Sequence, residues 1–160
     1  DHLGIVARGE GGNRGPGMAK LHLLPTLWFR NTWAWGCTHE GCWLRPGIRR
    51  IGPAQALARH ETLGEFYFEA GPGPDGTLPS MLFTENDTNT ARLYNAPNLS
   101  PYVRDAFHEY VIHGRSDAVN SQERGTKMAA HYVVEIPGGG AAAFTLRLTD
   151  EKDSPGPAAA

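Results

Sequence analysis

The sequence is short of cysteine, of long apolar segments and of net charge. Its two cysteines, Cys37 and Cys42, are too few for a disulfide framework. No apolar run approaches the roughly 20 residues that a membrane-spanning helix needs. The formal net charge of −2 leaves no basic footprint for nucleic acid. Neither nucleic acid nor a membrane is therefore an expected partner, and a reducing cytoplasm is the default location.

Secretory and catalytic signatures are also missing. The chain opens at Asp1 with no signal peptide and no initiator Met, which suggests a partial chain. It contains no G-x-S-x-G element, no phosphate loop and no dinucleotide-binding glycine pattern. Acidic residues of the kind that hydrolyse glycosidic bonds are present, but nothing in the sequence pairs them. They are Glu61, Glu85, Asp87, Asp105 and Glu109. We therefore assign no catalytic residue, no cofactor and no metal.

Glycine, proline and short apolar stretches are abundant. The 20 glycines and 12 prolines among 160 residues favour a loop-rich β protein over a helical one. Alternation of apolar and polar residues predicts strands, and Pro25, which cannot donate to a strand ladder, predicts a break, bulge or edge there. The last two predicted strands should form a hairpin through a Pro-Gly-Gly-Gly turn. The predicted strands cover 2–8, 18–29, 64–70, 78–85, 127–136 and 141–148.

One short helix is predicted, over about residues 101–113. Ser100 suits its N-terminal cap and Gly114 suits the position after its end. Apolar residues at helical spacing form one stripe along it. With the strands, this predicts a mainly β fold, a partial antiparallel β-sandwich over 1–150, followed by a linker or disordered tail over 151–160.

Three long stretches show no clear periodicity: 30–50, 86–99 and 114–126. Long structureless loops are uncommon in a compact domain. One interpretation is that they pack on a partner domain. The other is that they are plain surface loops.

The tryptophans concentrate in one part of the sequence. Aromatic faces stack on sugar rings, so a glycan platform is one interpretation. The structural interpretation, which we prefer, is that large aromatic side chains fill a core or an interface. Polar residues inside such a cluster would need partners if buried. The cluster comprises Trp28, Trp33, Trp35 and Trp43, with Arg30 and Asn31 among them.

Two further polar stretches are candidate metal sites. Cys37, His39 and Cys42 could supply three zinc ligands. A fourth would have to come from elsewhere, for example His108, His113 or His131, so a disulfide and free or buried thiols stay open as alternatives. The stretch 84–89 is rich in oxygen ligands but lacks the spacing of a calcium-binding loop. It is more typical of a strand end followed by turns capped by side chains.

Several long segments resemble large bacterial proteins grouped with glycoside hydrolase family 63, the processing α-glucosidase I-like enzymes. The first reads LHLLPTLWFRNTWAWG (21–36). The second reads MLFTENDTNTARLYNAPNLSPYVRDAFHEYVIHGRSDAVN (81–120). GTKMAAHYV and FTLRL follow them, so the resemblance covers roughly residues 18–149.

The resemblance implies that this chain is the later part of an N-terminal β-sandwich. In such proteins the sandwich precedes an (α/α)6 barrel, which carries the acid and base of an inverting hydrolysis. The implied partners are therefore that barrel and an oligosaccharide. The 85–98 loop and the predicted helix are expected to dock on the barrel. The alternative is a stand-alone carbohydrate-binding module that uses the tryptophans. The residues expected at a domain interface or substrate site are Trp33, Trp35, Arg30, Asn31, Glu85, Asn86 and Asn89.

Overall fold

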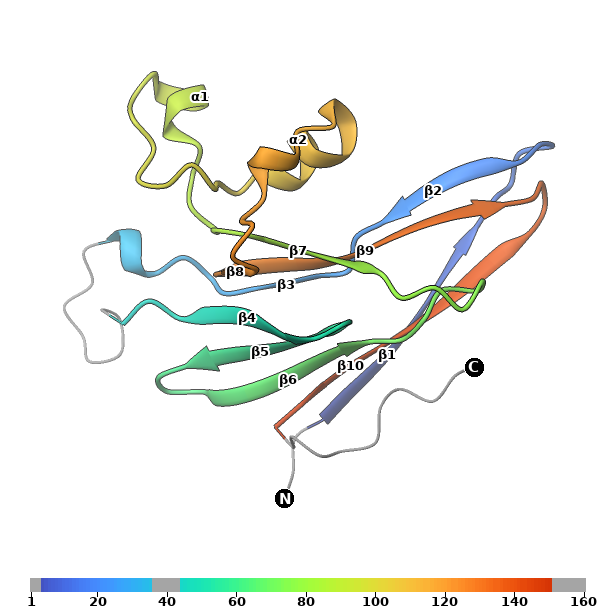
Figure 1. Ribbon diagram of the computed structural model, residues 1–160, viewed down its shortest axis with the longest axis horizontal. Helices are drawn as coiled ribbons and strands as arrows, with labels where there is room; N and C mark the ends of the chain where they lie inside the picture. Colours follow the sequence, from blue (N-terminus) through green and yellow to red (C-terminus); the bar gives the residue numbers. More distant parts are fainter. Residues whose placement is uncertain (1–3, 36–43, 151–160) are drawn as a thin grey trace.

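The structure, a computed structural model, describes residues 4–35 and 44–150. Two antiparallel β-sheets pack face to face, and the helices lie on the outer side of the smaller sheet (Figure 1). The predicted mainly β, sandwich-like fold is confirmed. Within the described residues, no helix is long and apolar enough to cross a membrane.

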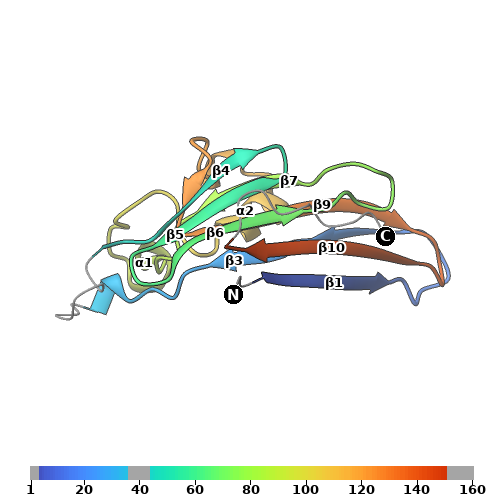
Figure 2. The same cartoon turned by 90° about the horizontal axis from the view of Figure 1, so that it is seen from below.

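The larger sheet has six strands in the order β1-β10-β6-β5-β4-β8. Figure 2 shows it with β1 along one edge and β4 toward the other. Its strands are β1 (Gly4–Gly12), β4 (Gly47–Gly52), β5 (Gln55–His60), β6 (Gly64–Ala70), β8 (Arg124–Gly125) and β10 (Ala141–Thr149).

The smaller sheet is built around β9 (Lys127–Ile136). One edge of β9 pairs with β2 (Ala19–Leu23) and then with β3 (Thr26–Trp28). The other edge pairs with β7 (Ser80–Thr84). Pro25 separates β2 from β3, which confirms the predicted break and follows from the missing N–H of proline.

A common apolar core fills the space between the sheets because the side chains of each strand alternate between its two faces. Tyr132 contributes to it and donates its hydroxyl to the carbonyl of Gly71 at 2.6 Å. Burial raises the pKa of Tyr132 to about 12. Buried members from both sheets include Ile48, Ala56, Phe68, Met81, Phe83, Met128, Val134 and Phe144.

One short helix covers part of the outer face of the smaller sheet. The α2 helix packs there through Phe107, which joins a second apolar cluster with Leu82 and Ala129. The helical segments are η1 (Trp33–Trp35), α1 (Thr90–Tyr94), α2 (Ala106–His113) and η2 (Ser116–Ala118).

The predicted helix start is wrong, although its end is right. The α2 helix begins at Ala106, and the Ser100 hydroxyl instead accepts the backbone N–H of Tyr102 within a turn. The chain before Ala106 is bonded to the end of β7, where the Thr84 hydroxyl donates to the Val103 carbonyl at 2.9 Å. This tertiary bond overrides the local helix signal. At the other end, Gly114 adopts a positive φ of 66°, as its predicted capping role requires.

The predicted hairpin between the last two strands is also wrong. Both strands form, but β9 lies in the smaller sheet and β10 in the larger one. Residues 137–140 therefore arch from sheet to sheet, beside a second arch over 13–18 that joins β1 to β2. Asn13 ties the arches together: its backbone N–H donates to Gly140 and its side-chain amide donates to Ile136.

Each stretch predicted to lack structure contains a short element. The 30–50 stretch holds η1 and β4, the 86–99 stretch holds α1, and the 114–126 stretch holds η2 and β8. The β4–β5 hairpin was missed because alanines, including Ala56 and Ala58, supply much of its core face and give no strong apolar alternation. The tail predicted over 151–160 lies outside the described residues.

Candidate functional site: a buried polar cluster between two clefts

The candidate site begins where β7 ends. Thr84, the last residue of β7, is fully buried, and its carbonyl accepts the backbone N–H of Thr126 at 3.1 Å. This bond places the next three residues, Glu85, Asn86 and Asp87, beside the chain that leads into β9. They leave the sheet as a loop, so their side chains are free to bond to other segments.

Asp87 is the centre of the site. One carboxylate oxygen accepts hydrogen bonds from the side-chain amide of Asn31 at 2.9 Å and the indole N–H of Trp33 at 2.8 Å. The other oxygen accepts from the Arg45 guanidinium at 2.5 Å. The Asp87 side chain is only 10% exposed. The carboxylate therefore satisfies the buried amide of Asn31, the half-buried indole of Trp33 and the partly exposed guanidinium of Arg45.

Glu85 shares Arg45 with Asp87. Its carboxylate lies 2.9 Å from the Arg45 guanidinium and accepts both the N–H and the hydroxyl of Thr126, at 3.0 and 2.7 Å. Burial alone would lower the pKa of Arg45, but hydrogen bonds to both carboxylates outweigh it and hold that pKa above its ordinary value. The same guanidinium lies 5.1 Å from the ring centroid of Trp33, within cation–π range.

Asn86 extends the network to two more segments. Its side-chain amide donates to the carbonyl of Phe29 at 2.9 Å, and its side-chain oxygen accepts from the Arg104 guanidinium at 2.9 Å. Its backbone N–H donates to the Thr126 hydroxyl at 2.8 Å. We call the whole set the Asp87 cluster: Asn31, Trp33, Arg45, Glu85, Asn86, Asp87, Arg104 and Thr126.

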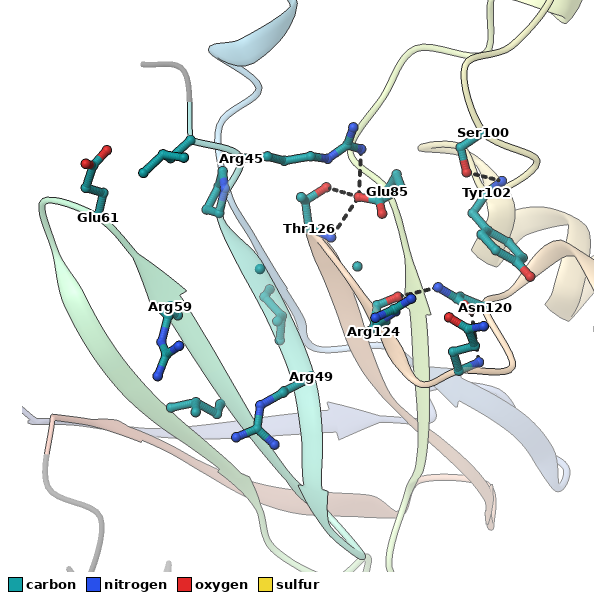
Figure 3. Close-up of a pocket in the computed structure, with 17 residues that line it drawn as sticks. Arg45, Arg49, Arg59, Glu61, Glu85, Ser100, Tyr102, Asn120, Arg124 and Thr126 are labelled. Atoms are coloured by element: carbon teal, nitrogen blue, oxygen red, sulfur yellow. Dashed lines mark hydrogen bonds and ion pairs between the residues drawn. The ribbon is translucent and has the colours of Figure 1, made fainter. Parts of the chain in front are cut away.

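The Asp87 cluster separates two clefts. A cleft of about 820 Å³, here the arginine cleft, is lined by Arg45, Glu85 and Thr126 together with Arg49, Arg59 and Arg124 (Figure 3). A cleft of about 680 Å³, here the Trp28 cleft, is lined by Asn31, Asn86 and Arg104 together with Trp28, Arg30 and Lys127. The side chains of the cluster thus form the wall between two concave surfaces.

The remaining predicted site residues lie outside the Asp87 cluster or outside the residues that the structure describes. Asn89 belongs to a separate network, where its side-chain oxygen accepts the Arg92 N–H at the start of α1 and its amide donates to Asp105. Arg30 lies at the rim of the Trp28 cleft. The side chain of Trp35 and the whole of Trp43 lie outside the described residues.

The arrangement is that of a bracing cluster rather than of a hydrolytic pair. Glu85 and Asp87 each accept at least three hydrogen bonds or ion pairs from within the chain. A general acid needs a proton that it can give to a substrate, whereas these carboxylates are held by Arg45 and other internal donors. Among the described residues, no group of three histidine, cysteine or acidic side chains could hold a metal ion. The predicted Cys37, His39 and Cys42 set lies outside those residues.

Comparisons with known proteins give one relative of much greater length. The chain is 34% identical over 152 residues to the Saccharomyces cerevisiae protein named "Uncharacterized protein YMR196W". The match covers 82% of this chain but only 14% of the yeast protein. No family model matches, and no solved structure matches. The chain thus spans a small part of the length of the curated relative that it matches.

Sequence reasoning identified part of the Asp87 cluster and missed the rest. Asn31, Trp33, Glu85 and Asn86 were predicted as site residues, and the structure brings them together. Asp87 was named only as one of several unpaired acids and as part of an oxygen-rich turn, not as a site residue. The sequence carried no signal for the other members, which come from separate segments and meet only in the fold: Arg45, Arg104 and Thr126.

Proposed function

We propose that this chain is a non-catalytic β-sandwich portion of a glycoside hydrolase-like protein of the α-glucosidase I type. The full protein would act on oligosaccharides through an (α/α)6 barrel, and this portion would pack against that barrel. The observation that carries the proposal is the Asp87 cluster, which fixes the 29–35, 85–89 and 100–104 segments at one end of the sandwich. The match to a small part of a longer relative also supports it.

The end of the sandwich that carries the Asp87 cluster would serve to position the substrate. A barrel of this class would supply the acid that protonates the glycosidic oxygen and the base that activates water. This portion would hold the rim of the substrate pocket in one position, so that the bound sugar is correctly oriented. A cytoplasmic location is part of the same proposal, on the basis of the sequence features given above.

The test uses the full protein that carries this chain. Changing Glu85 and Asn86 together to alanine removes bonds to Arg45, Thr126, Phe29 and Arg104. We expect kcat/KM for glucose release from an α-glucosidic oligosaccharide to fall about 10- to 100-fold, because small misplacements at a substrate pocket are costly. The matched control is Glu10→Ala, an exposed change on β1 that should leave kcat/KM unchanged. Normal kcat/KM and normal stability in the double variant would remove the proposal.

A stand-alone carbohydrate-binding module is the second candidate. It is favoured by Trp28, which is 53% exposed and lines the Trp28 cleft beside Arg30. Against it, two of the polar side chains that line this cleft, Asn31 and Asn86, already bond within the chain. Titration of maltotriose into the 160-residue chain distinguishes the two. Binding that is lost in Trp28→Ala supports the module, and no binding supports the accessory portion.

A further inference from the structure

The arginine cleft carries positive charge that the bracing role does not use. Four arginines line it, with two acidic residues, Glu61 and Glu85. Arg45 pairs with Glu85 and Asp87, and Arg59 pairs with Glu65 on the neighbouring strand. Within the described residues, no ion pair joins Arg49 or Arg124 to an acidic side chain. Arg49 and Arg124 are therefore the two arginines of the cleft that form no ion pair with an acidic side chain among the described residues.

Strand register puts Arg49 and Arg124 opposite each other on neighbouring strands. Arg49 on β4 is the direct register partner of Arg124 on β8. Ile48, the neighbour of Arg49, is buried in the core at 1% exposure, so Arg49 points to the outer face of the larger sheet. Like charges directly opposite each other on antiparallel strands are destabilising. A bound anion would convert this unfavourable pair into a favourable site.

The charge of Arg49 affects a neighbouring carboxylate, Glu65. The pKa of Glu65 lies below its ordinary value because of its hydrogen bond to Arg59 and, as a smaller contribution, the charge of Arg49. The chain as a whole has a net charge of −2, so this positive region is local. Figure 3 shows Arg59 and Arg49 over β5 and β4, Arg124 across from them beside Asn120, and Arg45 and Glu85 toward the top of the view.

Part of the cleft wall is apolar. Leu57 is the register partner of Arg49 on the outer face of β5, yet it is only 6% exposed. Tyr102 lines the cleft from the segment before α2. The cleft volume of about 820 Å³ lies within the range of small-molecule sites, which combine apolar walls with a few placed polar groups.

We propose that the arginine cleft binds a phosphorylated small molecule. Its phosphate is held by the guanidinium groups of Arg49 and Arg124, and its organic body lies toward Leu57 and Tyr102. Guanidinium groups present paired N–H donors that match phosphate oxygens, which makes arginine well suited to this role. Glu61 and Glu85 interrupt the positive region, so a long polyanion would meet repulsion where a single phosphate would not. The proposal is independent of the function proposed above.

The test is calorimetric titration of the full 160-residue chain. Glucose 6-phosphate is the probe, because it joins one phosphate to a ring, and glucose and inorganic phosphate are the comparison ligands. We expect glucose 6-phosphate to bind, glucose to show no binding and inorganic phosphate to bind more weakly. In Arg49→Gln/Arg124→Gln, affinity should fall at least about tenfold, as expected for the loss of charged hydrogen bonds. The matched control is Arg14→Gln, in the exposed arch between β1 and β2, which should bind as the native chain does.

Further variants and ligands keep the outcome decisive. Arg49→Lys/Arg124→Lys keeps the charge but loses the paired donors, so its affinity should lie between those of the native chain and the glutamine variant. If circular dichroism shows that the glutamine variant is unfolded, the salt dependence of the native chain decides: affinity should fall as NaCl rises. Salt-independent binding, equal binding of glucose, or tighter binding of a short DNA duplex would each overturn the proposal.

Discussion

Asp87 holds three separate segments through one carboxylate. Asn31 and Trp33 come from the chain after β3, Arg45 comes from the chain before β4, and Asp87 itself follows β7. None of these segments pairs with another as a strand at this point. Side-chain hydrogen bonds therefore hold them together, where backbone hydrogen bonds would do so in a sheet. The positions of Asn31, Trp33 and Arg45 therefore depend in part on a single buried acid.

Replacing Asp87 should be strongly destabilising. Asp87→Ala leaves the indole N–H of Trp33 without its acceptor and takes one of two acceptors from both Asn31 and Arg45, so we expect the free energy of unfolding to fall by about 2–4 kcal/mol. Urea denaturation followed by tryptophan fluorescence measures this. The matched control is Asp117→Ala, which removes an exposed acid paired with Arg115 and should leave the midpoint unchanged. Equal midpoints for the two variants would contradict the central role of Asp87.

His131 should make stability depend on pH. It is buried on β9, where its ring nitrogen lies 2.9 Å from that of His22 and Tyr110 contacts its ring edge-on. Burial lowers the pKa of His131, and the charge of His22 lowers it further. The unfolded chain therefore takes up a proton at higher pH than the folded chain, so the contribution to stability is complete above the ordinary histidine pKa of about 6.5 and is lost as pH falls below it.

We expect the free energy of unfolding of the native chain to fall between about pH 7.5 and pH 5.5, and to fall less in His131→Gln. Urea titrations at both pH values measure the two slopes. His108→Gln is the control, because His108 is exposed on α2, and it should keep the native slope. The acids with lowered pKa, including Asp105 and Asp117, lose their contributions only at lower pH. Parallel pH profiles for the native chain and His131→Gln would refute the assignment.

Some members of the candidate site could be predicted from sequence, but their geometry could not. Asn31 and Trp33 stood out because polar groups inside an aromatic segment need partners, and Glu85 and Asn86 stood out by their polarity after a strand. Their role at a domain interface stays a prediction. Arg45 lies 42 positions from Asp87, and no local pattern links two residues that far apart. Trp33 is half-buried, and part of its side chain is contacted by Asp87 and Arg45 of this chain.

At the scale of elements, the junction of β7 and β8 controls the candidate site. A Cβ atom added at Gly125 would lie 2.1 Å from the carbonyl oxygen of Thr84, a backbone atom that cannot move aside cheaply. Gly125 directly precedes Thr126, whose hydroxyl bonds both Glu85 and Asn86. The close approach of two backbones is thus what brings the Asp87 cluster together.

Gly125→Ala should therefore be destabilising by about 1–3 kcal/mol, the usual cost of forcing an extra carbon into a packed site. Thermal unfolding measured by circular dichroism would show it as a lower Tm. The matched control is Gly47→Ala on the paired strand β4, where an added Cβ meets no atom within 4 Å. A Gly125→Ala chain as stable as the Gly47→Ala chain would show that the junction can relax.

The elements themselves were easier to predict than their partners. The alternation of Tyr132, Val134 and Ile136 identified β9 correctly, because period two is a property of the strand alone. The pairing of β9 with β10 was wrong because a glycine-rich turn signals a reversal of the chain and not which sheet the chain re-enters. The deciding bonds come from Asn13, more than a hundred residues earlier in the sequence. The start of α2 was wrong for the same reason, since the bond from Thr84 to Val103 is tertiary.

At the scale of the whole molecule, β1 leaves one edge of the larger sheet unpaired by any other described strand. Ile5 and Val6 on this edge are 65% and 67% exposed. A long apolar edge can pair with the edge of a second molecule. This edge is therefore where we expect self-association of the 160-residue chain.

Val6→Glu should reduce that self-association. The new carboxylate faces Arg147, its register partner on β10, so the fold should tolerate it while the edge becomes charged. Sedimentation velocity over a range of chain concentrations measures the effect. Leu63→Glu, in the exposed turn between β5 and β6, makes the same chemical change away from the edge and should not alter association. Equal effects of the two substitutions would show that the edge is not the contact.

The pairing of the strands joined by the two arches also determines which strands can pair before the whole chain has been synthesised. The first strands, β1 and β2, pair only with the last two, β10 and β9, and β3 also pairs only with β9. During synthesis, which proceeds at about 5–20 residues per second, β1, β2 and β3 must therefore wait for the C-terminal strands to emerge, whereas β4, β5 and β6 can already pair with one another. Until then the early strands present unpaired edges, so this is the period in which a chaperone would be most useful to the nascent chain.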